Sequence, residues 1–209
     1  MKKMLLRWKK GKKYCYSMYL VFDTETTGLP RNYNAPVSDS ANWPRLVQLA
    51  WAWYDAQGNR WDYHNHIIRP DGFVIPDDAA KVHRITTERA LAEGKALSDV
   101  LDIFVKEVSR ARHIVGHNVD FDEKIVGAEL YRLSLPDVFL LANKLCTMRL
   151  SSDAIKVSNG RGGYKWFTLS DLHQHLFDEK FDDAHDAMVD VFACGRCLFG
   201  LKKRYGLSI

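Results

Sequence analysis

The stretch Tyr19-Leu-Val-Phe-Asp-Thr-Glu25 determines how the rest of the sequence is interpreted. It is rich in residues that favour β-strands, and Gly28 and Pro30 stop it soon afterwards. Residues two apart on a strand point to the same face, so the carboxylates of Asp23 and Glu25 project together. Two acids at the end of an apolar strand are costly to bury without a cation, and oxygen ligands favour Mg²⁺ or Mn²⁺. The stretch therefore predicts a buried strand that ends in a divalent metal site.

The segments that follow alternate between the patterns of strands and helices. Two strands at 46–54 and 61–68, joined by a hairpin turn, come after a long loop at 29–45 that holds three prolines. A short buried strand is expected at 113–116, and the stretch from 134 to 158 has no regular pattern. Helices are predicted at 98–108 with Ser98 as N-cap, 120–133, 169–176 and 187–203. These elements imply a single α/β domain with a mixed sheet over residues 18–209.

The composition is that of an ordinary soluble globular protein. Of 209 residues, 46% are hydrophobic and 27% charged, enough for one full domain with a sizeable core. No apolar run approaches 18 residues, so no membrane-spanning helix and no membrane partner are expected.

Residues 1–17 are expected to form a basic arm. The first thirteen of them hold seven Lys and Arg and no acid. Without these seven, 23 basic residues face 26 acidic ones, a net charge of −3, so the arm supplies the positive balance. Such an arm can attract phosphates, or it can be a solubilising tail. Its apolar stretch is too short for an export signal, and organelle targeting is the alternative interpretation.

Four cysteines are too few for a disulfide framework in a chain of this size. Cys194 and Cys197 have the C-x-x-C spacing that also suits redox and zinc sites. They fall within the apolar periodicity of the last predicted helix, so we expect them to be core residues. This usage indicates a reducing compartment, and the predicted location is the cytoplasm.

The segment Gly116-His-Asn-Val-Asp-Phe-Asp122 places two acids where a short strand passes into a helix. Asp120 could cap that helix, and Asp122 could be a first-turn acid favoured by the helix dipole. Those interpretations account for each acid singly, but they leave the adjacent His117 and Asn118 unexplained.

The segment from Asp182 to Asp190 adds a third group of acids and a histidine. Asp182, Asp183 and Asp186 suit a solvated helix start, whereas Asp190 interrupts an apolar segment. Residues five apart on a helix are about 140° apart. His185 and Asp190 can therefore act together only if His185 lies on the loop that enters the helix.

Together these segments resemble the motifs of the DEDDh (DnaQ-like) 3′→5′ exonucleases. The matching residues are Asp23-Thr-Glu-Thr-Thr-Gly28, His117-Asn-Val-Asp-Phe-Asp122 and His185 with Asp190, and the resemblance covers about residues 18–200. Lys81-Val-His-Arg-Ile-Thr86 is similar to a weaker fourth segment. The resemblance implies a ribonuclease H-like α/β fold with a five-stranded mixed β-sheet flanked by α-helices. It also implies a metal-dependent 3′→5′ exonuclease similar to the epsilon subunit of DNA polymerase III.

The resemblance assigns a role to each of five residues. Asp23, Glu25, Asp122 and Asp190 would bind two divalent cations, Mg²⁺ with Mn²⁺ as a substitute, and His185 would be the general base. The metal-binding acid of the second motif follows its Phe, which selects Asp122 over Asp120.

Contacts to the terminal nucleotide are assigned less directly. Thr26, Leu29 as an apolar wedge, His83 and Asn118 are the candidates, although each suits a turn, a cap or packing equally well. Trp51 and Trp53 lie in a predicted strand and suit the core, whereas Trp43 and Trp166 lie near loops and could stack on bases. The long loop at 29–45 and the Gly-rich loop at 159–163 depart from the family's pattern.

The expected substrate is the 3′ end of single-stranded DNA or RNA, with DNA favoured and a role of the proofreading or repair type. RNA 3′-end trimming is the alternative, because the motifs do not include a group that recognises the 2′-OH. A non-catalytic nucleic-acid-binding module, a phosphatase or an endonuclease could also be built on clustered acids. Proofreading would require a separate polymerase or repair protein as partner.

Overall fold

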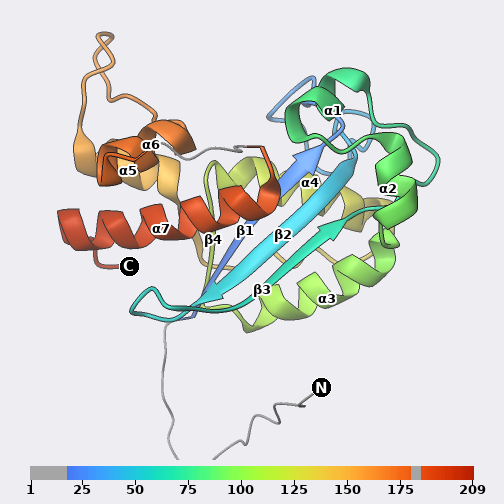
Figure 1. Ribbon diagram of the computed structural model, residues 1–209, viewed down its shortest axis with the longest axis horizontal. Coiled ribbons are helices and arrows are strands. Elements are labelled where there is room, and N and C mark those ends of the chain that lie inside the picture. Colours follow the sequence, from blue (N-terminus) through green and yellow to red (C-terminus); the bar gives the residue numbers. More distant parts are fainter. Residues whose placement is uncertain (1–17, 180–184) are drawn as a thin grey trace, which may run out of the picture.

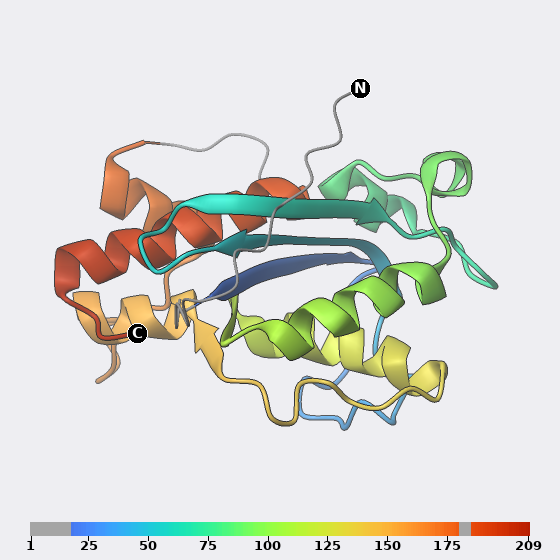
Figure 2. The same cartoon turned by 90° about the horizontal axis from the view of Figure 1, so that it is seen from below.

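The computed structural model describes residues 18–179 and 185–209, which form a five-stranded sheet with helices on both faces (Figures 1 and 2). The predicted basic arm at 1–17 lies outside the described residues. The strand order is β3-β2-β1-β4-β5. The strands are β1 (Tyr19–Thr26), β2 (Leu46–Tyr54), β3 (Arg60–Ile67), β4 (His113–Gly116) and β5 (Lys144–Cys146). β1 pairs antiparallel with β2 and parallel with β4, so the prediction of a mixed α/β sheet is confirmed.

β1 lies at the centre of the sheet because both of its faces are apolar. Leu20 and Phe22 belong to the core under α3 (Leu97–Arg110) and α4 (Val119–Arg132). Tyr19 and Val21 belong to the opposite core, under α7 (Ala187–Tyr205). Figure 2 shows α3 and α4 on one side of the sheet and α7 on the other. Because helices cover both faces of β1, its acids are accessible only at the rim of the sheet, where α4 and α7 begin.

The remaining helices are shorter and lie around this core. They are α1 (Asp77–His83), α2 (Thr87–Glu93), α5 (Thr147–Ile155) and α6 (Leu169–Phe177). The stretch that carried no regular pattern contains β5 and α5, which the sequence did not reveal because β5 has three residues and a single buried one.

Two predicted helix caps are wrong. Ser98 lies inside α3, whose N-cap is Ala96, and Asp120 lies inside α4, whose N-cap is Asn118. In both cases the helix begins one turn or less before the capping residue that the sequence suggested.

The core predictions for tryptophan and cysteine are confirmed. Trp51 and Trp53 are fully buried. Cys194 and Cys197 are buried in α7, and burial raises the pKa of the Cys197 thiol to about 12. A thiol that holds its proton this firmly is a packing group rather than a redox or metal-binding one.

The long loop at 29–45 is held tightly against one face of α4. Glu129, fully buried, accepts hydrogen bonds from Arg45 Nε at 2.9 Å and from Leu46 N at 3.0 Å. Arg132 lies 3.0 Å from the same carboxylate and donates to the carbonyls of Ser40 and Trp43. The loop is therefore part of the folded core and not a loose excursion.

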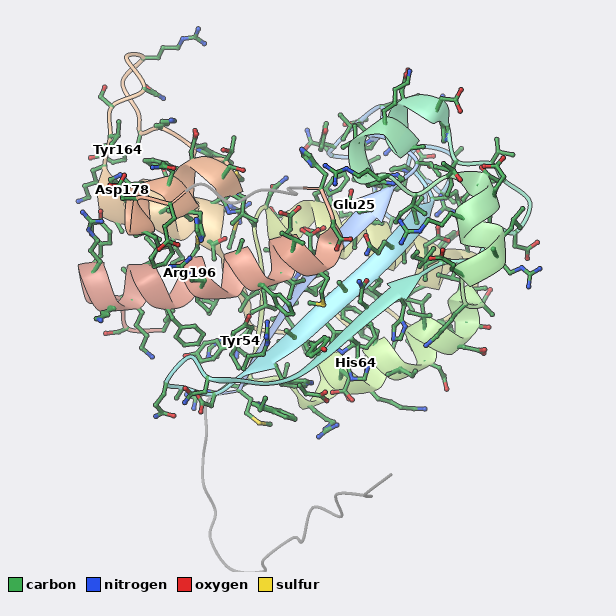
Figure 3. The ribbon with its side chains drawn as sticks, viewed as in Figure 1. Glu25, Tyr54, His64, Tyr164, Asp178 and Arg196 are labelled. Carbon is green, nitrogen blue, oxygen red and sulfur yellow. The ribbon has the colours of Figure 1, made fainter. Side chains whose placement is uncertain are left out.

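Trp43 does not fulfil its predicted stacking role, because it is part of this arrangement. It is 3% exposed, and its Nε1 donates to the carbonyl of Pro36 at 3.0 Å. Trp166 is 59% exposed, beyond a Gly-rich turn closed by a bridge between Ser158 and Tyr164. Figure 3 shows Tyr164, at one end of this turn, far from Glu25, and Trp166 is not among the residues that line the pocket over the acids.

Removal of the buried Glu129 carboxylate should destabilise the fold much more than removal of an exposed one. Glu129→Ala leaves two arginines without their shared anion, a loss of about 3–5 kcal/mol for a broken buried pair. Glu93→Ala, which breaks the exposed pair with Arg89, should cost under about 1 kcal/mol. Urea unfolding of both variants measures the difference, and equal small losses would show that Glu129 does not fix the loop.

Candidate active site

Three carboxylates meet at the rim of the sheet where β1 ends. Asp23 and Glu25 lie on the face of β1 that α7 covers, and Asp190 comes from the first turns of α7. Ligand oxygens of the three lie within 4.8 Å of one another, close enough for one cation to bridge them. Figure 3 shows Glu25 at the end of β1 beside the start of α7.

Asp122 reaches the same place from α4, on the other face of the sheet. It is 3% exposed, and its Oδ1 accepts hydrogen bonds from Thr24 N at 3.1 Å and Thr24 Oγ1 at 2.7 Å. Asp120 points elsewhere and forms an exposed ion pair with Arg149. The structure thus brings Asp122, and not Asp120, to the acids of β1.

His185 lies on the loop before α7, which is the position that would allow it to act together with Asp190. α7 begins at Ala187, with Asp186 as N-cap, and His185 precedes that cap with a φ of 75°. Non-glycine residues adopt this left-handed conformation rarely. The backbone N–H of His185 donates to Asp190 Oδ2 at 3.1 Å, which ties the exposed histidine to the acid cluster. Asp182 and Asp183 lie outside the described residues.

Gln48 is a site residue that the sequence analysis did not identify. It pairs with Glu25 across the β1–β2 ladder and is 2% exposed. Its Oε1 accepts from Ala187 N at 3.2 Å, and its Nε2 donates to Asn65 Oδ1 at 2.9 Å. Because a backbone N–H can only donate, this contact fixes the orientation of both amides. A buried amide in an otherwise apolar strand was the signal available in the sequence.

The four acids share a large excess of negative charge. Burial, then repulsion from Asp190 and Asp122, raises the pKa of Glu25 to about 8. Burial raises the pKa of Asp122 to about 7 despite the bonds from Thr24, and that of Asp190 to about 6. Burial and four carboxylate neighbours raise the pKa of Asp23 well above its ordinary value. A bound divalent cation would relieve this repulsion, so the donor set fits a metal.

A pocket of about 410 Å³ lies over these acids. Three of the four substrate-contact candidates line it: Thr26, the 73% exposed Leu29 and the buried His83. Asn118 does not line it and faces a neighbouring pocket. The candidate set is therefore split between two cavities.

His117 also lines the pocket over the acids, and contacts at both of its ring nitrogens hold the ring in place. Nε2 lies 3.0 Å from the carbonyl of Phe167, so it carries the proton, and Nδ1 lies 2.9 Å from Thr147 Oγ1. Burial lowers the pKa of His117 to about 4. This neutral ring joins the end of β4 to the start of α5 and forms one wall of the pocket.

The sequence model of the RNase T family, described as exonucleases, matches residues 20–198. The chain belongs to this exonuclease family. The predicted resemblance to an exonuclease family and the ribonuclease H-like fold are confirmed.

Solved structures of exonuclease I have the same fold. The zinc-bound complex of Escherichia coli exonuclease I with single-stranded DNA has a TM-score of 0.72 at 20% identity and covers 91% of this chain. The complex of the same enzyme with a dT13 oligonucleotide has a TM-score of 0.71 at 21% identity and covers 90% of this chain. Exonuclease I of Methylocaldum szegediense has a TM-score of 0.70 at 18% identity and also covers 90% of this chain. This chain spans only 41% of each of those three chains.

No curated protein sequence matches the chain. Among the helices of the described residues, none is both long and apolar enough to cross a membrane.

The raised pKa values predict how pH affects the stability of the metal-free exonuclease domain. A carboxyl whose pKa is higher in the folded state stabilises the fold while protonated and loses that contribution as pH rises. The free energy of unfolding should therefore fall between about pH 4 and 8 in chelator, through the folded pKa values of Asp190, Asp122 and Glu25. Added Mg²⁺ should remove most of the fall.

Urea unfolding at a series of pH values, with chelator or with Mg²⁺, measures this effect. Glu25→Gln should flatten the decline in chelator, because it removes a group that takes up a proton on folding. Asp120→Asn is the matched control outside the cluster and should keep the wild-type slope. A slope unchanged by Glu25→Gln would contradict the assignment of the decline to the cluster.

Proposed function

We propose that this chain releases nucleoside 5′-monophosphates from the 3′ end of single-stranded DNA, with two Mg²⁺ ions in the site and His185 as general base. The observation that carries the proposal is the acid cluster of Asp23, Glu25 and Asp190 at the floor of a pocket of about 410 Å³. Ligand pockets run from about 300 to 1,000 Å³, so this one suits a single terminal nucleotide better than a length of strand.

Each acid has a place in the proposed chemistry. Asp23, Glu25 and Asp190 would hold the ions from the α7 side, and Asp122 from the α4 side, where Thr24 orients its carboxylate. When bound, the ions would supply a hydroxide-like nucleophile and neutralise the leaving 3′ oxygen. Mn²⁺ should substitute, because the ligands are all carboxylate oxygens.

His185 would take the proton of the attacking water. Its backbone is tied to Asp190, and its exposed ring lies at the edge of the pocket. An imidazole nitrogen can accept a proton from water, and histidine is the side chain most often used as a general base. Leu29 would act as a wedge beside the terminal base, with Thr26 and His83 against the same nucleotide.

DNA is favoured over RNA as substrate because the similar exonuclease I structures include complexes with single-stranded DNA. The alternative is an RNA-trimming enzyme. Matched DNA and RNA oligonucleotides, each with a free or a blocked 3′ end and assayed in Mg²⁺ and in Mn²⁺, separate the two. A blocked 3′ end that does not slow degradation would instead indicate an endonuclease. A separate polymerase or repair protein as partner, and a cytoplasmic location, remain part of the proposal.

Catalysis should depend on the acid cluster and on His185 to different degrees. Asp190→Asn removes a metal ligand and should abolish metal-dependent release of nucleotides from a labelled oligonucleotide. His185→Ala removes only the base and should slow release by roughly 10²–10⁴-fold without loss of stability.

The control for both variants is Asp102→Asn, an exposed acid of α3 that lines neither the pocket over the acids nor its neighbour, which should retain the wild-type rate. If His185→Ala retains the full rate across neutral pH, another group takes the proton. If Asp190→Asn retains it, the cluster is not the catalytic site and the non-catalytic binding module becomes the better hypothesis.

A further inference from the structure

A second pocket of about 410 Å³ lies beside the one over the acids. Tyr33 and Asn34 of the 29–45 loop line one side of it, and Asn118, Phe121 and Lys124 from the start of α4 line the other. The ring of Tyr33 is 52% exposed and lies 6.4 Å from that of Phe121. The pocket thus combines an accessible aromatic ring, two amides and an ammonium group.

The two pockets are neighbours, because Phe121 lines both. Leu29 at the edge of the first pocket and Tyr33 in the second lie four residues apart on the same loop. Asn118, the substrate candidate that the first pocket does not contain, faces the second. A strand that leaves the first pocket past Phe121 would therefore reach the second pocket next.

The backbone that carries Tyr33 is held in place before any ligand arrives. Lys124 Nζ donates to the carbonyl of Tyr33 at 2.8 Å. On either side of the loop, Asn32 and Asn42 exchange two hydrogen bonds of 2.8 and 2.9 Å. A ligand that stacks on the Tyr33 ring therefore does not have to order the loop first, which lowers the entropic cost of binding.

The acids of the second pocket do not exclude an anionic strand. Glu123 is paired with Lys144 at 2.6 Å, and Asp120 is paired with Arg149. Lys124 adds a further positive charge near the Trp43 ring. Single-stranded nucleic acid is bound by this combination of aromatic rings and cations, and every base offers a face to stack.

We propose that the second pocket binds the nucleotide next to the 3′-terminal one, with the base of that nucleotide stacked on Tyr33. This proposal rests on the proposed function, because it assigns a further part of the same substrate. It makes Tyr33 a substrate-binding residue contributed by the loop that departs from the family's pattern.

The test compares two substrates that share the terminal nucleotide. The p-nitrophenyl ester of thymidine 5′-monophosphate has no second nucleotide, whereas a dT oligonucleotide has one. Tyr33→Ala should lower kcat/KM for the oligonucleotide by about 5- to 150-fold, the effect expected for one lost base stack. It should change kcat/KM for the ester by less than 2-fold. Tyr33→Phe keeps the ring and should behave as wild type.

Tyr131→Ala is a matched control, because Tyr131 is also 52% exposed but lies near the end of α4 and not in the pocket. It should leave both substrates unaffected. An oligonucleotide that lacks the penultimate base gives a second measurement without any mutation. It should be a poorer substrate for the wild type by about the same factor, and Tyr33→Ala should not lower its rate further.

The outcomes separate the two proposals. If the wild type cleaves neither substrate in Mg²⁺ or Mn²⁺, the proposed function fails. If it cleaves the oligonucleotide but Tyr33→Ala changes nothing, or slows both substrates equally, Tyr33 does not bind the second nucleotide. An abasic penultimate position without effect on the wild type would overturn the proposal even if Tyr33→Ala were unstable.

Discussion

The repulsion among four buried carboxylates at the end of β1 is the constraint on which the rest of the structure depends. Burial and mutual repulsion raise the pKa values of all four. In the unfolded chain, acids such as Asp23 and Asp190 are far apart and solvated, and folding forces them together. The apolar cores on both faces of β1 therefore stabilise the fold against the repulsion among these carboxylates. A bound divalent cation would reduce that repulsion.

Two helices deliver their acids to this point in the same way. Asp122 is the fourth residue of α4, and Asp190 is the fourth residue of α7. A left-handed residue precedes each helix, Asn118 with a φ of 71° and His185 with a φ of 75°. The tight turn aims the positive end of the helix dipole at the acids, which offsets a small part of their charge. The positions of both acids thus follow from the way the helices begin.

The sequence was most informative where local pattern and chemistry coincide. The apolar run of β1 that turns acidic predicted both the buried strand and the acids at its end, and the C-x-x-C stripe predicted a packed helix. β5 escaped prediction because three residues carry no periodicity. Gln48 and His117 escaped because their roles depend on partners far along the chain, Ala187 and Phe167. Trp43 was misassigned for the same reason, since burial by the loop cannot be inferred from a loop sequence.

The 29–45 loop shows where prediction from local sequence ends. Its prolines and asparagines indicate only an irregular segment, but Lys124, Glu129 and Arg132 of α4 fix it at contacts that span about 90 positions of the chain. The acid site follows from the short segments that contain Asp23, Asp122 and Asp190. The shape of the loop depends on a few charged residues of α4 outside those segments. The loop and the acid site are therefore held by different residues of α4, so a substitution at Glu129 or Arg132 would disturb the loop without removing an acid.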